Sequence, residues 1–385
     1  MVIRIACMLV LTFCLTISAM AQTLTVGFFQ YVPDISAFEK NLTAQWQQLE
    51  PDVSLKFVPW DCYSALPQFD VDVFVYDGIY LASYEKSGYL LPLGKTIPDQ
   101  KAYPDWTLAP AKIQGQYYGI PQMVCRDTLF YRKGDAAVAN AKTMQELYDA
   151  IGPRQTDKLL PDSNEGVLAD FSIGNGLKYY SALQDHTQQV APVLDKQHLD
   201  PGVMKYVREL YAMTGEKTGK YENQNSFTRA IWFANGHGRA LYAYPEAMSE
   251  IASLGKADDV EMKAISSCEH PDVATAYTDY VSVNANIAPD KKEKAKKLAA
   301  LLTSKPYMLA VLRPQEKGQT RQYLLAARKD VMQQLAKEDK VYAKSYQNLY
   351  NQPNLHVMTG SEDYTAWEAK LQPEIQKELD QGAKQ

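Results

Sequence analysis

A single cysteine, Cys125, stands in the middle of the apolar run "GIPQMVCRDTLFYRKGD", which ends in a charged turn. A thiolate is a strong nucleophile, but a free thiol has a pKa of about 8.5. Cys125 could therefore do nucleophilic chemistry if a nearby base takes its proton. Arg126 could stabilise the thiolate, although neighbouring residues of a strand point to opposite faces. The alternative is a structural role, because cysteine in an apolar run packs as a small hydrophobe.

The N-terminus carries the pattern of a signal peptide over residues 1–21. Arg4 supplies the positive charge, residues 5–17 are apolar, and Ala19-Met20-Ala21 forms an A-x-A cleavage site. No later stretch approaches the roughly 20 apolar residues that span a bilayer. We therefore expect a protein without a membrane span that begins near Gln22 and is periplasmic or secreted.

Cysteine usage then becomes informative. Cleavage removes Cys7 and Cys14 and leaves Cys62, Cys125 and Cys268, an odd number for an oxidising compartment. At least one of the three is then free or pairs with another chain. We expect Cys62 and Cys268 to be reduced, because the layout proposed below places them in opposite lobes, where a bridge would hamper closure.

Composition limits the classes of function. The 385 residues are too many for one compact core, so two domains are expected. A net charge of -5 argues against a nucleic-acid partner, since phosphate binding usually needs a basic face. The chain has no H-E-x-x-H and no C-x-x-C motif, and its histidines are scattered, so we expect no metal site. These histidines are His186, His198, His237, His270 and His356.

The hydrophobic pattern predicts alternating strands and helices. Strands are expected at 24–29, 53–58 and 71–75, with a helix after Pro33-Asp34 and another near 81–87. Ser36 and Glu39 have the spacing of a capping box. Strands and helices that alternate in this way indicate an α/β fold with a parallel sheet.

The second half of the chain continues the pattern. A capping box at Thr143 and Glu146 begins one helix, and Asp200-Pro201 begins another through Tyr211. Strands are expected at 239–244 and 277–283. A helix should follow the strand at 239–244, with Pro245 in its first turn. An amphipathic helix is expected at 289–303, with its lysines on a solvated face.

Several stretches resemble the type II periplasmic binding proteins, which have two α/β lobes and a ligand cleft between them. "DVFVYDGIYLASYEKSGYLLPL" has that family's strand, loop and helix, and "KIQGQYYGIPQMVCRDTLFYRKGD" looks like the crossing to the second lobe. "YTDYVSVNANIAPDKKEKAKKLAALL" looks like the crossing back. The implied domains are 22–121 with 282–330, then 122–281, and C-terminal helices at 331–385 that pack on the lobes.

One enzyme family on that fold is more similar, thiaminase I. The similar stretches are "YVPD", "DVFVYD", "GYLLP", "GIPQMVC", "LFYRKGD", "YPEAM", "YTDYVSVN" and "LRPQEKGQTRQYLLAAR", between residues 31 and 328. The resemblance implies a transferase that displaces the thiazole of thiamine. A cysteine adds to the pyrimidine, the thiazole leaves, and a small outside nucleophile takes its place before the cysteine is expelled.

The same resemblance implies roles for individual residues. Cys125 matches the nucleophile, and Glu246 in "YPEAM" matches the glutamate that activates it. The residues that match the substrate-binding cleft are Tyr31, Asp77, Tyr244, Tyr277 and Asp279. Thiamine and the nucleophile are the expected partners, with no cofactor and a monomeric protein.

Other readings of these residues stay open. Asp77 before Gly78 is a common turn pattern, and Tyr277 alternating with Asp279 suits a solvated sheet edge. The helix dipole at Glu246 would lower its pKa, whereas burial would raise it. A periplasmic protein that binds thiamine or a pyrimidine without cleaving it is the alternative function. A Cys-His hydrolase is a third, but no histidine has a supporting motif.

Overall fold

The structure is a computed structural model that describes residues 22–61, 70–156, 158, 160–169, 175–189, 198–215, 226–271, 274–350 and 355–382. The predicted signal peptide and Cys62 lie outside these residues. Within the described part of the chain, no helix has the length and apolar character that a membrane span requires.

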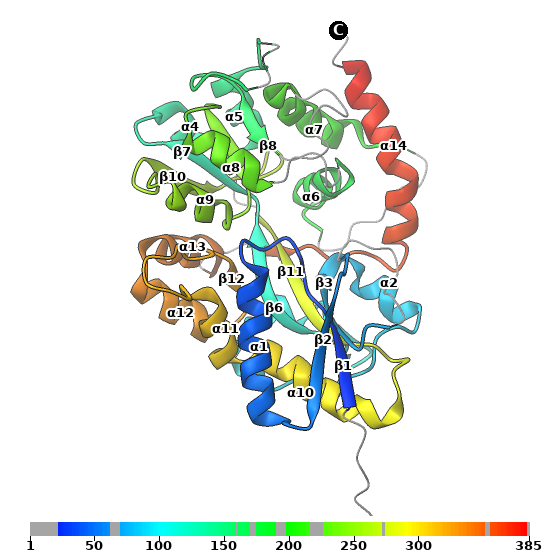
Figure 1. Cartoon of the computed structure of the whole chain (residues 1–385). Coiled ribbons are helices and arrows are strands. Elements are labelled where there is room, and N and C mark those ends of the chain that lie inside the picture. The colour runs from blue at the N-terminus through cyan, green and yellow to red at the C-terminus, as the bar shows by residue number, and fades with distance from the viewer. Residues whose placement is uncertain are drawn as a thin grey trace, which may run out of the picture.

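The chain forms two lobes, each built on its own sheet, with β6 and β11 running through the junction (Figure 1). The first sheet has seven strands in the order β12-β6-β11-β3-β1-β2, with β13 paired to β11. Its strands are β1 (Gln22–Gly27), β2 (Val53–Val58), β3 (Val73–Asp77), β6 (Ile120–Arg126), β11 (Ala274–Val283), β12 (Leu325–Ala326) and β13 (Leu355–Val357).

The first sheet is mixed rather than wholly parallel, which corrects the sequence prediction. β1 pairs in parallel with both β2 and β3, as the alternating pattern indicates. β11 is antiparallel to β3 and to β6. The reason is the path of the chain: β11 follows the elements of the second lobe and therefore enters the first sheet from the opposite end.

The second sheet has four strands in the order β10-β7-β9-β8. These are β7 (Thr128–Arg132), β8 (Val167–Ala169), β9 (Ala240–Ala243) and β10 (Val260–Ala264), and a separate hairpin pairs β4 (Lys112–Ile113) with β5 (Gln116–Tyr117). Only one residue, Asp127, separates β6 from β7. The crossing between the sheets is therefore short. The predicted domain limits at 121/122 and 281/282 fall inside β6 and β11.

Helices cover both sheets. The first lobe carries α1 (Ile35–Leu49), α2 (Leu81–Lys86), α3 (Asp105–Leu108), α10 (Lys292–Leu302), α11 (Lys305–Leu312), α12 (Lys329–Glu338) and α13 (Lys340–Tyr350), with the short 3-10 turns η1 (Gly78–Tyr80), η2 (Gln100–Ala102) and η3 (Pro289–Lys291). The second carries α4 (Ala136–Asn140), α5 (Met144–Ile151), α6 (Asn175–Thr187), α7 (Pro201–Thr214), α8 (Ser226–Ala234) and α9 (Ala247–Ser253).

The last helix, α14 (Tyr364–Gly382), runs alongside both lobes (Figure 1). It packs against η1 of the first lobe and against α6 and α7 of the second. The ring of Tyr364 lies 5.7 Å from that of Tyr80 and 5.1 Å from that of Tyr180. The helix thus joins the lobes through aromatic contacts on the side of the junction.

The start of α1 differs from the sequence prediction. Asp34, not Ser36, is the N-cap, because its carboxylate accepts a hydrogen bond from the Ala37 amide. Ser36 lies inside the helix and donates its hydroxyl to the same carboxylate at 2.6 Å. Asp34 lies two residues before Ser36 and has the same capping chemistry. The Ser36 and Glu39 pattern therefore predicted a cap two residues too late.

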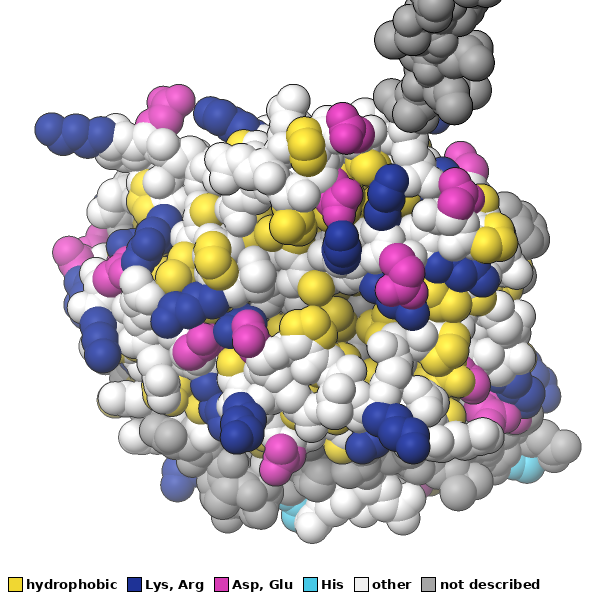
Figure 2. All heavy atoms as spheres, turned by 90° about the horizontal axis from the view of Figure 1, so that it is seen from below, with side chains coloured by type: hydrophobic (Ala, Val, Ile, Leu, Met, Phe, Trp, Pro, Cys, Tyr) yellow, Lys and Arg dark blue, Asp and Glu magenta, His cyan; other side chains and the backbone are white. Residues whose placement is uncertain are grey.

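The lysine-rich helix α10 agrees with the prediction. Ala295, Leu298 and Leu302 are buried on its inner face, and Lys296 and Lys297 form exposed ion pairs with Glu293 and Glu50. Figure 2, which shows the molecule from below, has Lys and Arg side chains interspersed with Asp and Glu on this face. Lys296 and Lys297 of α10 are therefore offset by acidic neighbours.

Candidate active site

The site is built where β3, β11 and β6 lie side by side. Antiparallel pairing sets Tyr277 opposite Cys125 and Asp279 opposite Met123. On the other edge of β11, Asp279 faces Asp77, the last residue of β3. Because residues two apart on a strand share a face, this register brings Cys125, Tyr277 and the two aspartates to one end of the first sheet.

Asp77 has a defined structural role as well. It is the N-cap of η1, and its Oδ1 accepts a hydrogen bond from the Ile79 amide at 3.0 Å. Gly78 must be glycine here, because a Cβ would lie 2.6 Å from the Thr278 carbonyl oxygen and 2.5 Å from the Tyr280 ring. The tight turn after β3 therefore packs directly against β11.

The two aspartates resist ionisation. Both are buried, with exposed fractions of 4% for Asp77 and 5% for Asp279. Burial raises the pKa of Asp77, with the charge of Glu368 adding to the effect. The pKa of Asp279 is raised well above its usual value by burial first and then by the charges of Asp77 and Glu246. This pair can hold a proton near neutral pH.

Glu246 stands at the N-cap position of α9, directly after β9 and the turn at Pro245. The sequence left two opposing effects at this position, the helix dipole and burial. Burial dominates: it raises the pKa of Glu246 to about 7, against a lowering effect from a hydrogen bond with its own backbone amide. A carboxyl with this pKa can both accept and return a proton at neutral pH.

Cys125 is a free, partly exposed thiol beside these carboxyls. Its pKa is raised well above the usual range, chiefly by burial and then by the charges of Asp279, Glu246 and Asp77. The resting thiol is therefore protonated. Nucleophilic attack by its sulfur requires a base at the moment of reaction, and Glu246 is a neighbour with a suitable pKa.

The aromatic residues form the wall next to Cys125. The rings of Tyr244 and Tyr277 meet edge to face with centroids 5.6 Å apart. The Tyr277 hydroxyl donates to Asp127 Oδ2 at 3.0 Å, and Lys178 Nζ contacts Asp127 Oδ1 at 2.9 Å. Lys178 also lies over the Tyr244 ring, 5.2 Å from its centroid. The buried ion pair thus fixes both tyrosine rings.

Sequence reasoning missed Asp127 and Lys178. Asp127 is the residue between the two crossing strands, and a charge directly after an apolar strand was a signal that could have found it. Lys178 lies 51 residues further on, in α6, and no sequence pattern links it to the site. The exposed fractions of the two side chains are 4% for Asp127 and 12% for Lys178.

Glu368 of α14 was also missed. Its carboxylate accepts hydrogen bonds from Tyr80 at 3.1 Å and from Tyr364 at 3.0 Å. Burial raises its pKa, and its charge acts on Asp77. The C-terminal helix therefore adds a further carboxyl to the electrostatic environment of the site.

Two further residues make contacts outside the acidic cluster. Arg126 turns from Cys125, as strand alternation suggests, and donates from Nη1 to the Asn348 carbonyl at 2.8 Å. Tyr31 lies in the loop between β1 and α1 with an exposed fraction of 39%, and its ring meets Phe29 edge to face at 5.7 Å. Of the seven predicted residues, six therefore gather near the junction and Tyr31 lies on the surface.

Comparison with solved structures first defines the class of protein. The chain matches a maltotriose-binding protein of Thermus thermophilus over 94% of its length and 99% of that chain, with a TM-score of 0.61 and 16% identity. At this identity the similarity concerns the fold alone. The two lobes with residues gathered at their junction are those of a type II periplasmic-binding-protein-like fold.

The family follows from more similar proteins. Residues 126–268 match the Thiaminase-1 domain. Thiaminase-1 of Paenibacillus thiaminolyticus is 38% identical over 355 residues, which covers 90% of this chain and 85% of that protein. Thiaminase I of Bacillus thiaminolyticus superposes with a TM-score of 0.85 at 36% identity, over 93% of this chain and 99% of that one.

A third structure, Clostridium botulinum thiaminase I in complex with thiamin, also has a TM-score of 0.85, at 32% identity, and covers 94% of this chain and 100% of that one. The chain belongs to the thiaminase I family. This membership identifies the activity class as that of a thiamine-cleaving transferase.

Proposed function

We propose that Cys125 is the nucleophile of the thiamine-cleaving reaction and that Glu246 is its base. The observation that carries the proposal is the position of a protonated thiol beside a glutamate whose pKa is about 7. Glu246 takes the proton as the sulfur bonds to a pyrimidine carbon. The electron pair displaced from the ring is accommodated on a ring nitrogen, which needs a hydrogen-bond donor.

Asp279 is suited to be that donor. A carboxylic acid that stays protonated at neutral pH can donate a hydrogen bond to a ring nitrogen and supply a proton as negative charge develops. Asp77, paired with it across the strands, shares the environment that disfavours ionisation. The two aspartates therefore act as proton donors to the pyrimidine rather than as fixed negative charges.

The later steps use the same groups in reverse. The ring electrons return and break the bond from the methylene to the thiazolium nitrogen, so the thiazole leaves as a neutral molecule. An outside nucleophile bonds to the methylene carbon, and the thiolate is expelled as the ring regains its aromaticity. Cys125 then recovers a proton from Glu246, and the cycle is complete without a cofactor.

The tyrosines supply binding. Thiamine is an aromatic cation, and aromatic faces attract both rings and positive charge. Tyr277 and Tyr244 are held edge to face beside Cys125, and the pair of Asp127 with Lys178 fixes their position. We assign these rings to the pyrimidine and leave Tyr31, at the surface, as a residue of the outer cleft.

The test is Glu246→Gln, compared with Glu250→Gln on the same helix. Loss of a positioned general base costs about 10²–10⁴-fold in turnover, whereas Glu250→Gln should leave the rate unchanged. Thiamine binding, measured by calorimetry, should persist in both variants. Wild-type turnover in Glu246→Gln would remove Glu246 from the mechanism. Tight binding without turnover in the unmodified protein would favour the alternative, a thiamine-binding protein.

We also propose that the mature protein is an exported monomer. The A-x-A site at residues 19–21 after an apolar run supports export. N-terminal sequencing of protein recovered from the medium or periplasm should begin near Gln22. An intact leader on protein that stays in the cytoplasm would contradict this proposal.

A further inference from the structure

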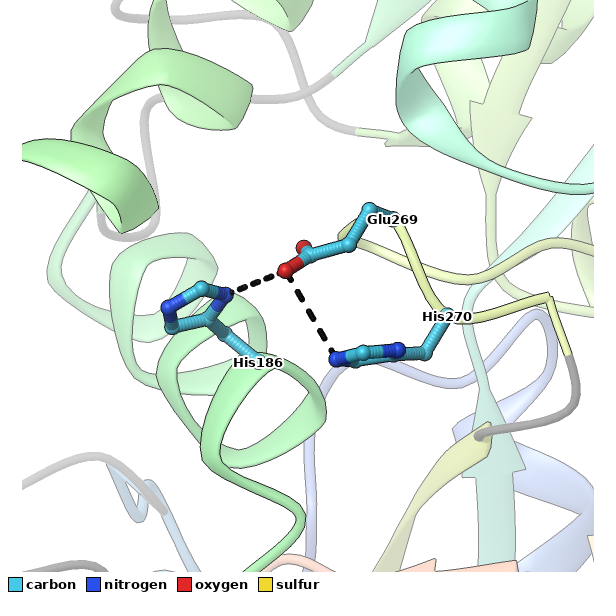
Figure 3. Close-up of side chains that lie close together, drawn as sticks. All are labelled: His186, Glu269 and His270. Atoms are coloured by element: carbon cyan, nitrogen blue, oxygen red, sulfur yellow. Dashed lines mark hydrogen bonds and ion pairs between the residues drawn. The ribbon is translucent and has the colours of Figure 1, made fainter.

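A second group of chemically capable side chains lies in the second lobe. His186 lies in the last turn of α6, and Glu269 and His270 lie in the segment between β10 and β11. Figure 3 shows the three side chains turned toward one another, with Glu269 between the imidazoles. Glu269 Oε1 lies 2.8 Å from His186 Nδ1 and 3.6 Å from His270 Nε2.

The geometry is that of a potential ligand set. One donor atom from each residue lies within 4.8 Å of the other two. The side chains are 31% to 37% exposed, so a cation can enter from solvent. Glu269 Oε2 is buried and has no hydrogen bond of good geometry among the described residues, while the Tyr206 side chain approaches the same carboxylate. A buried carboxylate oxygen without a partner is costly, and a cation would satisfy it.

The backbone that carries these ligands is fixed by other contacts. Asp185, next to His186, accepts hydrogen bonds from the Ser267 amide at 3.0 Å and from the Thr275 hydroxyl. The His270 amide donates to the sulfur of the buried Cys268 at 3.4 Å. The end of α6 and the segment before β11 are therefore held together without a metal, so the ligands are arranged in advance.

We propose that His186, Glu269 and His270 bind one divalent transition-metal cation of the Zn²⁺ type. Two imidazoles and one carboxylate suit Zn²⁺ or Cu²⁺, whereas Mg²⁺ and Ca²⁺ prefer sets of oxygen ligands. Solvent would supply the remaining ligand. The histidines that appear scattered along the sequence are brought together because α6 packs against β11.

This site is separate from the proposed active site. His186 lies eight positions after Lys178 on α6, which corresponds to about 12 Å along the helix axis. The cation would clamp α6 to the beginning of β11. These two elements also carry Lys178 and Tyr277, so the cation is expected to hold the wall of the cleft in place. Binding of the cation does not depend on the catalytic proposal.

The test is calorimetric titration of untagged protein with ZnCl₂. We expect one saturable site, weakened by about 10–100-fold or more in His186→Gln and in His270→Gln, since each removes one ligand. His237→Gln, a histidine elsewhere in the second lobe, is the matched control and should bind like the unmodified protein. MgCl₂ should give no saturable signal.

Electron paramagnetic resonance with Cu²⁺ gives a second readout. The nitrogen hyperfine structure should show two coordinated imidazoles in the unmodified protein and one in His270→Gln. The His270→Gln variant leaves α6 unaltered, so it tests the site even if His186→Gln disturbs the fold. Circular dichroism checks each variant. Absence of saturable Zn²⁺ binding, or equal binding by both single variants and the unmodified protein, would overturn the proposal.

Discussion

Cys125 and Cys268 are both free thiols in the described part of the chain, but they lie in different surroundings. Cys268 is fully buried in the second-lobe core, where its sulfur accepts the His270 amide and contacts Ser266. Cys125 is partly exposed at the junction, near the carboxyls of Asp279, Glu246, Asp77 and Asp127. Burial raises the pKa of both thiols, to about 12 for Cys268.

The comparison shows that burial alone does not make a cysteine reactive or inert. Cys268 has neighbours that hydrogen-bond its sulfur, and although the charges of Asp185 and Glu269 act on it, it is enclosed in the core of the second lobe. Cys125 has Glu246, whose pKa of about 7 allows proton transfer in both directions. What separates the two thiols here is that Cys125 is open at the junction of the lobes and has Glu246 beside it, whereas Cys268 is closed off from solvent.

The largest expected effect on stability concerns the ion pair beside Cys125. Lys178→Met leaves the Asp127 carboxylate buried and unpaired, so it should lower the free energy of unfolding by about 3 kcal/mol. Lys158→Met is the control, because its pair with Asp162 is exposed and should contribute nothing measurable. Urea denaturation measures both. Equal stability of the two variants would show that the buried pair does not support the tyrosine wall.

A smaller effect depends on pH. Glu246 has a higher pKa in the folded protein than its ordinary value of 4.5, so the folded state binds the proton more tightly. Stability is therefore unaffected below about pH 4.5 and falls as pH rises through 7. Glu246→Gln removes this cost and should be more stable than the unmodified protein by about 1–3 kcal/mol at pH 8.

Thermal denaturation between pH 4.5 and 8 tests this, with Glu250→Gln as the control. The advantage of Glu246→Gln should disappear at the acidic end of the range. A constant difference at every pH would mean that the glutamate is not held with a raised pKa.

The smallest effect is expected in the second lobe. Cys268→Ala removes a buried sulfur and its contacts, which should cost about 1–2 kcal/mol in stability. Turnover should stay unchanged once the protein is folded, because Cys268 lies outside the candidate active site. Denaturation and a rate assay on the same preparation decide the point; a large loss of rate with normal stability would contradict the structural role.

Much of the frame could be predicted from sequence because it follows local patterns. The strand at 53–58 matches β2 at both ends, and Asp200-Pro201 begins α7 as expected. The third strand was placed two residues early, since Val71 and Asp72 precede the pairing of β3 with β1. Local chemistry predicts elements well and their ends less well.

Tertiary contacts account for what could not be predicted. The antiparallel entry of β11 depends on the chain leaving for the second lobe and returning. The contact of Lys178 with Asp127, and the gathering of His186 with His270, join residues that are far apart in sequence. The raised pKa of Glu246 reflects desolvation in the fold, which overrides the helix dipole that the sequence suggested.

The most direct test of the central claim is turnover of thiamine by Cys125→Ser beside Cys268→Ser. Each protein is incubated with thiamine and an amine such as pyridine or aniline, and the pyrimidine product is followed by mass. Turnover should be lost in Cys125→Ser alone, with thiamine binding retained. Product formed at the unmodified rate by Cys125→Ser would contradict it and leave Cys125 as part of the cleft wall.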